Sequence, residues 1–173
     1  KTRKEMFNGK KVNHILPFAS FLKSSDVAQK KLLASKSLIS ISGVQEKYSL
    51  SLKGSELEVT DTHGQYILKP ISTGVANPDL VPANEHLTMQ IAGQVFKLPV
   101  AKSALIFFSD GQPAYITKRF DVKEDGSRCL KEDFASLAQE TDKTSGKGYK
   151  YDYNYERMGQ LIDEYFPAAI KAK

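Results

Sequence analysis

Short runs of alternating apolar and polar residues occupy the middle of the chain. They cover residues 48–52, 57–59 and 66–69, and turn residues that include a glycine separate them. Alternation with a period of two between glycine turns is typical of antiparallel strands. The pattern therefore predicts a three-stranded meander whose third strand ends before Pro70.

Helical spacing replaces the alternation after a loop that contains Pro78 and Pro82. Asn84 is a suitable N-cap for a helix over residues 85–96. The apolar stripe of this helix consists of Leu87, Ile91, Ala92 and Val95.

Two more strands are predicted after the helix, over residues 103–108 and 114–120. We expect the five strands to form one antiparallel sheet with the helix packed on one face. The order of three strands, a helix and two strands is that of a protein-kinase small lobe, although order alone does not establish function. The predicted core residues are Tyr48, Leu50, Leu52, Ile67, Ile106, Phe108 and Ile116.

Helices are predicted both before and after this sheet in the sequence, which makes the fold class α+β. Before it, Ser25-Asp26 offers an N-cap in a stretch with helical spacing. After it, residues 131–138 and 155–166 are predicted helices, and the polar stretch 141–153 is a predicted loop. The predicted domains are an N-terminal arm and helix over 1–36, a kinase-like small lobe over 37–122, and the beginning of a helical large lobe over 123–173.

Composition places the chain among ordinary globular proteins. Hydrophobic residues make up 40%, and no apolar run approaches the roughly 18 residues that span a bilayer. Cys129 is the only cysteine, which excludes an intrachain disulfide and a cysteine-based zinc site, so we expect a cytoplasmic protein without membrane contact. The net charge of +5 suits phosphate-bearing ligands or nucleic acid, and also a lysine-rich solvated surface; no direct nucleic-acid contact is predicted.

The histidines and a tyrosine cluster are two further candidate sites. The histidines at 14, 63 and 86 share no metal-ligand spacing, so we predict surface or partly buried histidines and no metal site in this segment. The tyrosines at 149, 151, 153 and 155 suggest base stacking. Their alternation with charged residues instead favours a loop that packs only when a large lobe is present.

Lys69 and Glu85 are a candidate pair for phosphate binding. Lys69 ends the third predicted strand, where its ammonium group could reach two phosphates as a point charge. A glutamate at the start of the next helix would fix the direction of this lysine, as in kinase small lobes. Each residue alone also fits an ordinary role, because Lys69 is an edge lysine and Glu85 is a first-turn glutamate favoured by the helix dipole.

Two other segments fit a nucleotide site in the same way. Residues 40–47, Ser-Ile-Ser-Gly-Val-Gln-Glu-Lys, would cover the phosphates, although a single glycine departs from the usual G-x-G-x-x-G pattern. Residues 114–121, Ala-Tyr-Ile-Thr-Lys-Arg-Phe-Asp, would form the hinge strand whose backbone meets adenine. Read singly, the two segments are also a serine-rich connection and an edge strand.

Taken together and in this order, the segments resemble the HipA family of bacterial toxin kinases. The resemblance covers roughly residues 37–166, and residues 1–36 are similar to the leader of the short HipT-like branch. The matching stretches are Ser-Ile-Ser-Gly-Val-Gln-Glu-Lys, Tyr-Ile-Leu-Lys-Pro, Asn-Glu-His-Leu-Thr-Met, Tyr-Ile-Thr-Lys-Arg-Phe-Asp and Lys-Glu-Asp-Phe.

The resemblance implies a role for each matched position. Lys69 matches the ATP-binding lysine, and Glu85 matches the helix carboxylate that holds it. Lys118 and Phe120 match hinge positions whose backbone contacts adenine. The loop that covers the phosphates matches Gly43, Val44, Gln45, Glu46 and Lys47.

Two serines just before this loop match phosphorylation sites of the family. Ser40 matches the serine that HipA-like kinases autophosphorylate, and Ser42 completes the Ser-Ile-Ser pair of the HipT-like branch. A phosphate there adds about −1.5 to −2 charge, which would repel ATP. We therefore expect phosphorylation of either serine to switch the kinase off, although both also fit a plain polar loop.

One part of the family pattern is missing from the chain. HipA-like kinases carry a catalytic aspartate in a His-x-Asp-x-His-x-Lys-Asn-type segment and a later aspartate that binds magnesium, and neither motif follows His86. We therefore expect the nucleotide-binding half of a kinase, inactive in phosphotransfer when alone. A truncated piece, a proteolytic fragment and a natural split protein all remain open.

The function implied by the resemblance is that of a serine/threonine kinase toxin that uses ATP and Mg²⁺, with the metal ligands in the missing C-terminal half. Such toxins arrest growth, and so promote persistence, by phosphorylating a translation component such as an aminoacyl-tRNA synthetase. An antitoxin, often a helix-turn-helix DNA-binding protein, accompanies them. The alternative is a non-catalytic, lobe-like module that binds or inhibits a partner protein and has no need to keep Lys69 and Glu85 in register.

Overall fold

A computed structural model describes most of the chain, which forms two compact units. The units are residues 1–122 and 123–173. The described residues are 2–20, 46–60, 64–72, 74–123, 125–146, 149 and 154–166. The helix predicted to start at Ser25-Asp26, the two serines at 40 and 42, and loop residues 43–45 lie outside them.

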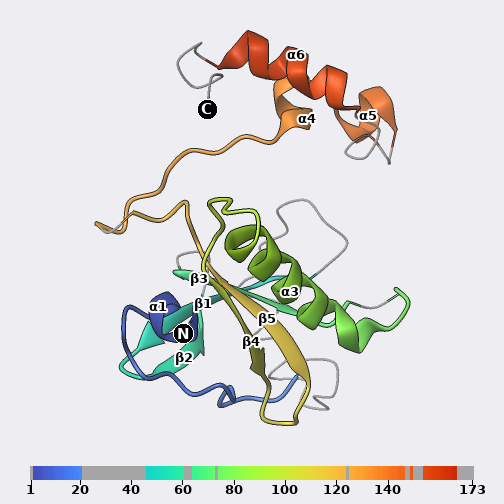
Figure 1. Cartoon of the computed structure of the whole chain (residues 1–173). Coiled ribbons are helices and arrows are strands. Elements are labelled where there is room, and N and C mark those ends of the chain that lie inside the picture. Colours follow the sequence, from blue (N-terminus) through green and yellow to red (C-terminus); the bar gives the residue numbers. More distant parts are fainter. Residues whose placement is uncertain are drawn as a thin grey trace. The chain divides into compact units, whose positions relative to one another are not determined.

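The first unit is built on a five-stranded antiparallel sheet, which confirms the predicted sheet. Its strand order is β2-β1-β3-β5-β4, as Figure 1 shows. β3 is one residue longer than predicted because Pro70 pairs with Ala114 at the strand end, where a missing N–H interrupts little of the ladder. The strands are β1 (Tyr48–Lys53), β2 (Glu56–Val59), β3 (Tyr66–Pro70), β4 (Ser103–Phe107) and β5 (Pro113–Lys118).

The helix between β3 and β4 begins earlier than its sequence pattern indicated. A short 3₁₀ helix, η1 (Pro78–Leu80), leads directly into α3 (Val81–Gln94). The predicted cap Asn84 is therefore inside the helix, and Leu80 is the N-cap. Pro82 does not break this helix, because proline in the first turn lacks only an N–H that would have no helical partner.

Three of the four residues predicted to form the apolar stripe of this helix are exposed, and the fourth, Ala92, is half-buried. Leu87, Ile91 and Val95 are 57%, 42% and 67% exposed. α3 lies against β4 and β5 (Figure 1), yet Pro82 is its only buried residue. The helix therefore contributes little buried apolar surface of its own, although Tyr115 of β5 is buried on the sheet face that it covers.

The hydrophobic core lies on the other face of the sheet. Tyr48, Leu50, Ile106, Phe108 and Ile116 are buried as predicted, and Leu52 packs half-buried against the same cluster. Ile67 is a correction to the predicted core. It alternates with the buried residues Tyr66 and Leu68, so the pleat places Ile67 on the face of α3, where it is half-buried.

The N-terminal segment covers the core face and is part of the first unit. It begins with α1 (Thr2–Met6) and extends along the edge strand β4, where Ile15 forms a parallel bridge with Phe107. The backbone N–H of Leu16 donates to the Phe107 carbonyl at 2.7 Å. Its buried residues in the core are Met6, Phe7, Val12 and Leu16.

The second unit contains three helices among its described residues: α4 (Phe134–Leu137), α5 (Asp142–Ser145) and α6 (Tyr155–Tyr165). Asp133 and Asn154 cap α4 and α6 by accepting backbone N–H bonds at 2.8 Å. The cap at Asp133 explains why α4 is shorter than the predicted helix over 131–138. α5 lies within the stretch that was predicted to be a loop. No helix in the described parts of the chain is long and apolar enough to cross a membrane.

Candidate functional site

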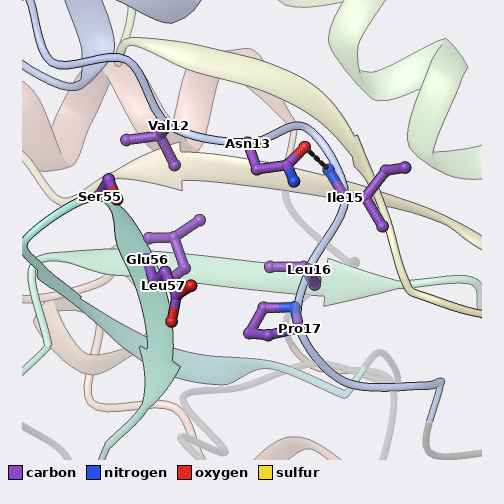
Figure 2. Close-up of a pocket in the computed structure, with 8 residues that line it drawn as sticks. All are labelled: Val12, Asn13, Ile15, Leu16, Pro17, Ser55, Glu56 and Leu57. Carbon is purple, nitrogen blue, oxygen red and sulfur yellow. Dashed lines mark hydrogen bonds between the residues drawn. The ribbon is translucent and has the colours of Figure 1, made fainter.

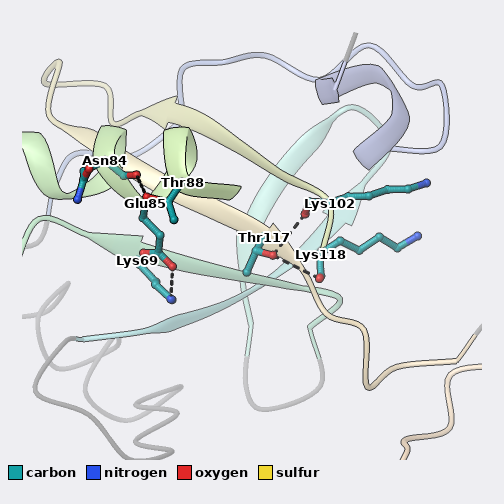
Figure 3. Close-up of polar contacts among 7 residues, drawn as sticks. All are labelled: Lys69, Asn84, Glu85, Thr88, Lys102, Thr117 and Lys118. Atoms are coloured by element: carbon teal, nitrogen blue, oxygen red, sulfur yellow. Dashed lines mark hydrogen bonds and ion pairs between the residues drawn. The ribbon is translucent and has the colours of Figure 1, made fainter. Parts of the chain in front are cut away.

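Lys69 of β3 and Glu85 of α3 form the ion pair that the sequence predicted. The Lys69 Nζ lies 2.5 Å from Oε1 of Glu85, and their side chains are 21% and 28% exposed. Figure 3 shows the two side chains pointing toward one another across the gap between strand and helix. The pair is shielded enough to be stronger than a fully exposed ion pair, yet remains accessible to a ligand.

Lys47 adds a second ammonium group to this pair. Tyr48 of β1 faces Leu68 of β3, so extending the register by one residue places Lys47 opposite Lys69. Burial lowers the pKa of Lys47, the charge of Lys69 lowers it further, and Glu85 raises it in part. Two like charges facing each other across a sheet destabilise it, so this cluster of two cations and one carboxylate favours an anionic ligand.

Tyr115 of β5 forms the floor of the cluster, a role that the sequence analysis missed. It pairs with Lys69 across the sheet, and Lys69 Nζ lies 5.4 Å from the centre of its ring. Burial raises the pKa of the Tyr115 hydroxyl, so the ring remains a neutral surface under the lysine. The signal was present in the sequence, because Tyr115 and Lys69 fall on the same face once β3 and β5 are paired.

Glu46, two residues before β1, is bonded to a residue of the core face. Its Oε2 accepts a hydrogen bond of 2.8 Å from the hydroxyl of Tyr48, a core residue. Burial and this bond raise the pKa of Tyr48. The structure therefore brings together Lys47, Lys69 and Glu85 but directs Glu46 away from them.

The two predicted hinge residues lie at the end of β5. Lys118 pairs with Tyr66, three residues along β3 from Lys69, a span of about 10 Å at strand spacing. Its Nζ donates to Asn8 Oδ1 at 3.3 Å, and in Figure 3 the side chain extends away from Lys69. Phe120 is 80% exposed just beyond the strand. Any hinge role of Lys118 would therefore have to come from its backbone.

A buried ion pair flanks Phe120 and was not anticipated from the sequence. Arg119 donates from Nε and Nη2 to the two carboxylate oxygens of Asp121, at 2.9 and 2.7 Å. Both side chains are almost fully buried, although surface strand ends usually carry solvated charges. No signal of charge or periodicity in the sequence separates this pair from a solvated one.

The described residues provide no alternative metal or ligand site of similar character. Among them, no group of three or more histidine, cysteine, aspartate or glutamate residues could hold a metal ion. Figure 2 shows a small pocket between the N-terminal segment and the β1–β2 turn, lined mainly by apolar groups, with Asn13 bonded to the backbone of Ile15. It lacks a cluster of cations, so it does not resemble a phosphate site.

Comparison with known protein families gives a match that covers the segments of the candidate site. The family model of the HipA-like C-terminal domain matches residues 39–173, which include the whole sheet, α3 and the second unit. A search of the curated proteins finds no match to this chain. Because the family model matches well over half of the sequence, the chain belongs to the family of HipA-like C-terminal domains.

Proposed function

We propose that this chain is the ATP-binding portion of a HipA-like serine/threonine protein kinase. The observation that carries the proposal is the cluster of Lys47, Lys69 and Glu85, in which a carboxylate on a helix orients a strand lysine beside a second lysine. A kinase small lobe needs such a strand lysine held by a helix glutamate to bind the phosphates of a nucleoside triphosphate. Family membership supports a kinase-related function, and the antiparallel sheet with one helix supports a kinase-like lobe.

ATP fits the residues that are present. Lys47 and Lys69 would bind the triphosphate, and Glu85 would keep Lys69 in place. The hinge backbone near Phe120, at the far end of β5 from Lys69, would bind adenine. Magnesium would be held by acidic residues outside this cluster, and its charge would offset the negative charge of the triphosphate.

The substrate, regulation and partners of the parent protein are proposed from the family alone. The kinase would phosphorylate a translation component, such as an aminoacyl-tRNA synthetase, and so act as a growth-arresting toxin. A second protein, an antitoxin that binds DNA, would neutralise it. Phosphorylation of Ser40 or Ser42 would switch the kinase off.

Calorimetric titration of the chain with ATP and with tripolyphosphate tests the proposed function. We expect both ligands to bind, and Lys69→Ala to weaken both by about tenfold to a hundredfold, because a charge-assisted hydrogen bond contributes roughly 1.5–3 kcal/mol. Lys102→Ala is the matched control, since Lys102 is exposed and extends away from Lys69 in Figure 3. Equal affinities of wild type and Lys69→Ala, or no binding at all, would favour a non-catalytic module.

A further inference from the structure

Just after β5, the two residues on either side of Phe120 form an ion pair with each other. Arg119 and Asp121 lie on either side of Phe120 and form a bidentate ion pair, with both side chains 96% or more buried. The backbone N–H of Arg119 also donates to the Gln65 carbonyl at 2.8 Å, which ties this point to the start of β3. Two buried side chains bonded across one residue restrict the backbone torsions of that residue.

Phe120, the residue between them, has a restricted backbone whose N–H and carbonyl are available to a ligand. Among the described residues, neither its backbone N–H nor its carbonyl has a hydrogen-bond partner, and the residue is 80% exposed. Backbone groups at a strand end ordinarily pair with protein or water. A fixed donor and acceptor beside an exposed aromatic ring suit the hydrogen-bonding edge of a planar base.

We infer that Arg119 and Asp121 are positioning residues that set the base specificity of the nucleotide site by fixing the backbone of Phe120. This inference rests on the proposed function, which assigns the hinge to adenine. The pair does not touch the ligand. The ion pair restricts the backbone torsions of Phe120 before the ligand binds, so less conformational entropy is lost on binding. Preorganisation of this kind raises affinity without adding a contact.

Burial of the pair supports a positioning role over a purely stabilising one. Removing a bidentate guanidinium–carboxylate pair from water is costly, and apolar replacements of such pairs are often as stable. Here the cost is greater still, because Arg119 Nη1 is buried without a partner among the described residues. An ion pair with this desolvation cost, next to a backbone N–H and carbonyl without partners in the described part of the chain, is consistent with a need to hold the backbone of Phe120 in one conformation.

The test compares base binding with phosphate binding in the whole chain. The variants are the apolar double substitution Arg119→Leu/Asp121→Leu and the single substitution Arg119→Lys, which keeps the charge but cannot form the bidentate pair. ATP, GTP and tripolyphosphate are titrated into each, and thermal unfolding reports folding. We expect about tenfold weaker ATP binding, reduced discrimination of ATP from GTP, and unchanged tripolyphosphate binding.

The exposed pair Lys53–Glu58, which joins β1 to β2 at 2.8 Å, provides the matched control. Lys53→Gln/Glu58→Gln should leave all three affinities as in the wild type. Unchanged ATP binding in a folded Arg119 variant overturns the inference, as does an equal loss for ATP and tripolyphosphate, which indicates a general structural role. If the double variant does not fold, Arg119→Lys decides by the same criteria. A wild-type chain that binds tripolyphosphate but no nucleotide refutes this inference alone, whereas one that binds neither refutes the proposed function.

Discussion

Glu85 is the residue that joins α3 to Lys69 on the sheet. Its Oε1 lies 2.5 Å from the Lys69 Nζ, while Pro82 is the only buried residue of the helix. The ion pair thus adds a direct link between strand and helix to the limited apolar burial of α3. The position of α3 and the direction of Lys69 are therefore coupled, and a ligand that binds Lys69 would also affect the helix.

This coupling predicts a measurable interaction energy. In a double-mutant cycle with Lys69→Met and Glu85→Leu, we expect the two changes to be non-additive by about 1 kcal/mol, the value for a well-formed and partly shielded pair. Urea unfolding of the four proteins measures it. Strictly additive effects would show that the pair contributes nothing to the folded state.

Lys47 makes stability depend on pH in a defined direction. Burial and the charge of Lys69 lower its folded-state pKa below 10.5, although Glu85 partly opposes this. Between the folded and unfolded pKa values the unfolded chain binds more protons, so the free energy of unfolding rises with pH. Below the folded pKa the penalty for charging Lys47 is fully present. Lys47→Gln should therefore stabilise the protein at pH 7 in phosphate-free buffer, with a shallower rise toward pH 10.5.

Lys53 is the control with the opposite sign. Its hydrogen bond to Glu58 raises its pKa, so its stabilising contribution is fully present below 10.5 and is lost as pH rises through the folded value. Lys53→Gln should destabilise the protein at pH 7. If Lys47→Gln also lowers the free energy of unfolding at pH 7 in urea unfolding, as Lys53→Gln should, then the charge of Lys47 does not destabilise the folded state.

The sheet was predictable because alternation and glycine turns determine it locally. Tyr48 and Leu50, for example, are two residues apart and both reach the core. α3 was harder, since Leu87 and Ile91 have the spacing of a buried stripe but are exposed. A periodic apolar pattern shows that residues share a helix face and does not show which surface that face meets.

The candidate site was predictable in part, for a similar reason. Lys69 and Glu85 could be paired because a strand and the following helix bring them together in kinase small lobes. The contribution of Tyr115 depends on cross-strand register, and the burial of Arg119 with Asp121 depends on tertiary packing around the strand end. Neither property is present in a single stretch of sequence.

The N-terminal segment should be essential for the stability of the sheet. Phe7 is 1% exposed in the core, and its ring centre lies 5.2 Å from that of Tyr66. Phe7→Ala should lower the free energy of unfolding by about 3–5 kcal/mol, the usual cost of truncating a buried phenylalanine. Ile15→Ala, in the same segment but at a 45% exposed position, should cost much less. Equal, small losses in urea unfolding would mean that the segment is only loosely attached.

Added negative charge at Ser40 or Ser42 should weaken nucleotide binding. Both serines lie outside the described residues, but they precede Lys47 closely in the sequence, and Lys47 and Lys69 are the cations proposed to bind the triphosphate. A phosphate, with about −1.5 to −2 charge, would repel ATP and compete for these lysines. We expect Ser40→Asp and Ser42→Asp to lower ATP and tripolyphosphate affinity alike, and more so at low salt, since the effect is electrostatic. Ser40→Asn and Ser42→Asn have nearly the same shape as the aspartate variants but carry no charge, so they should bind both ligands as the wild type does. If aspartate and asparagine variants bind equally well in calorimetric titrations, charge at these positions does not control the site.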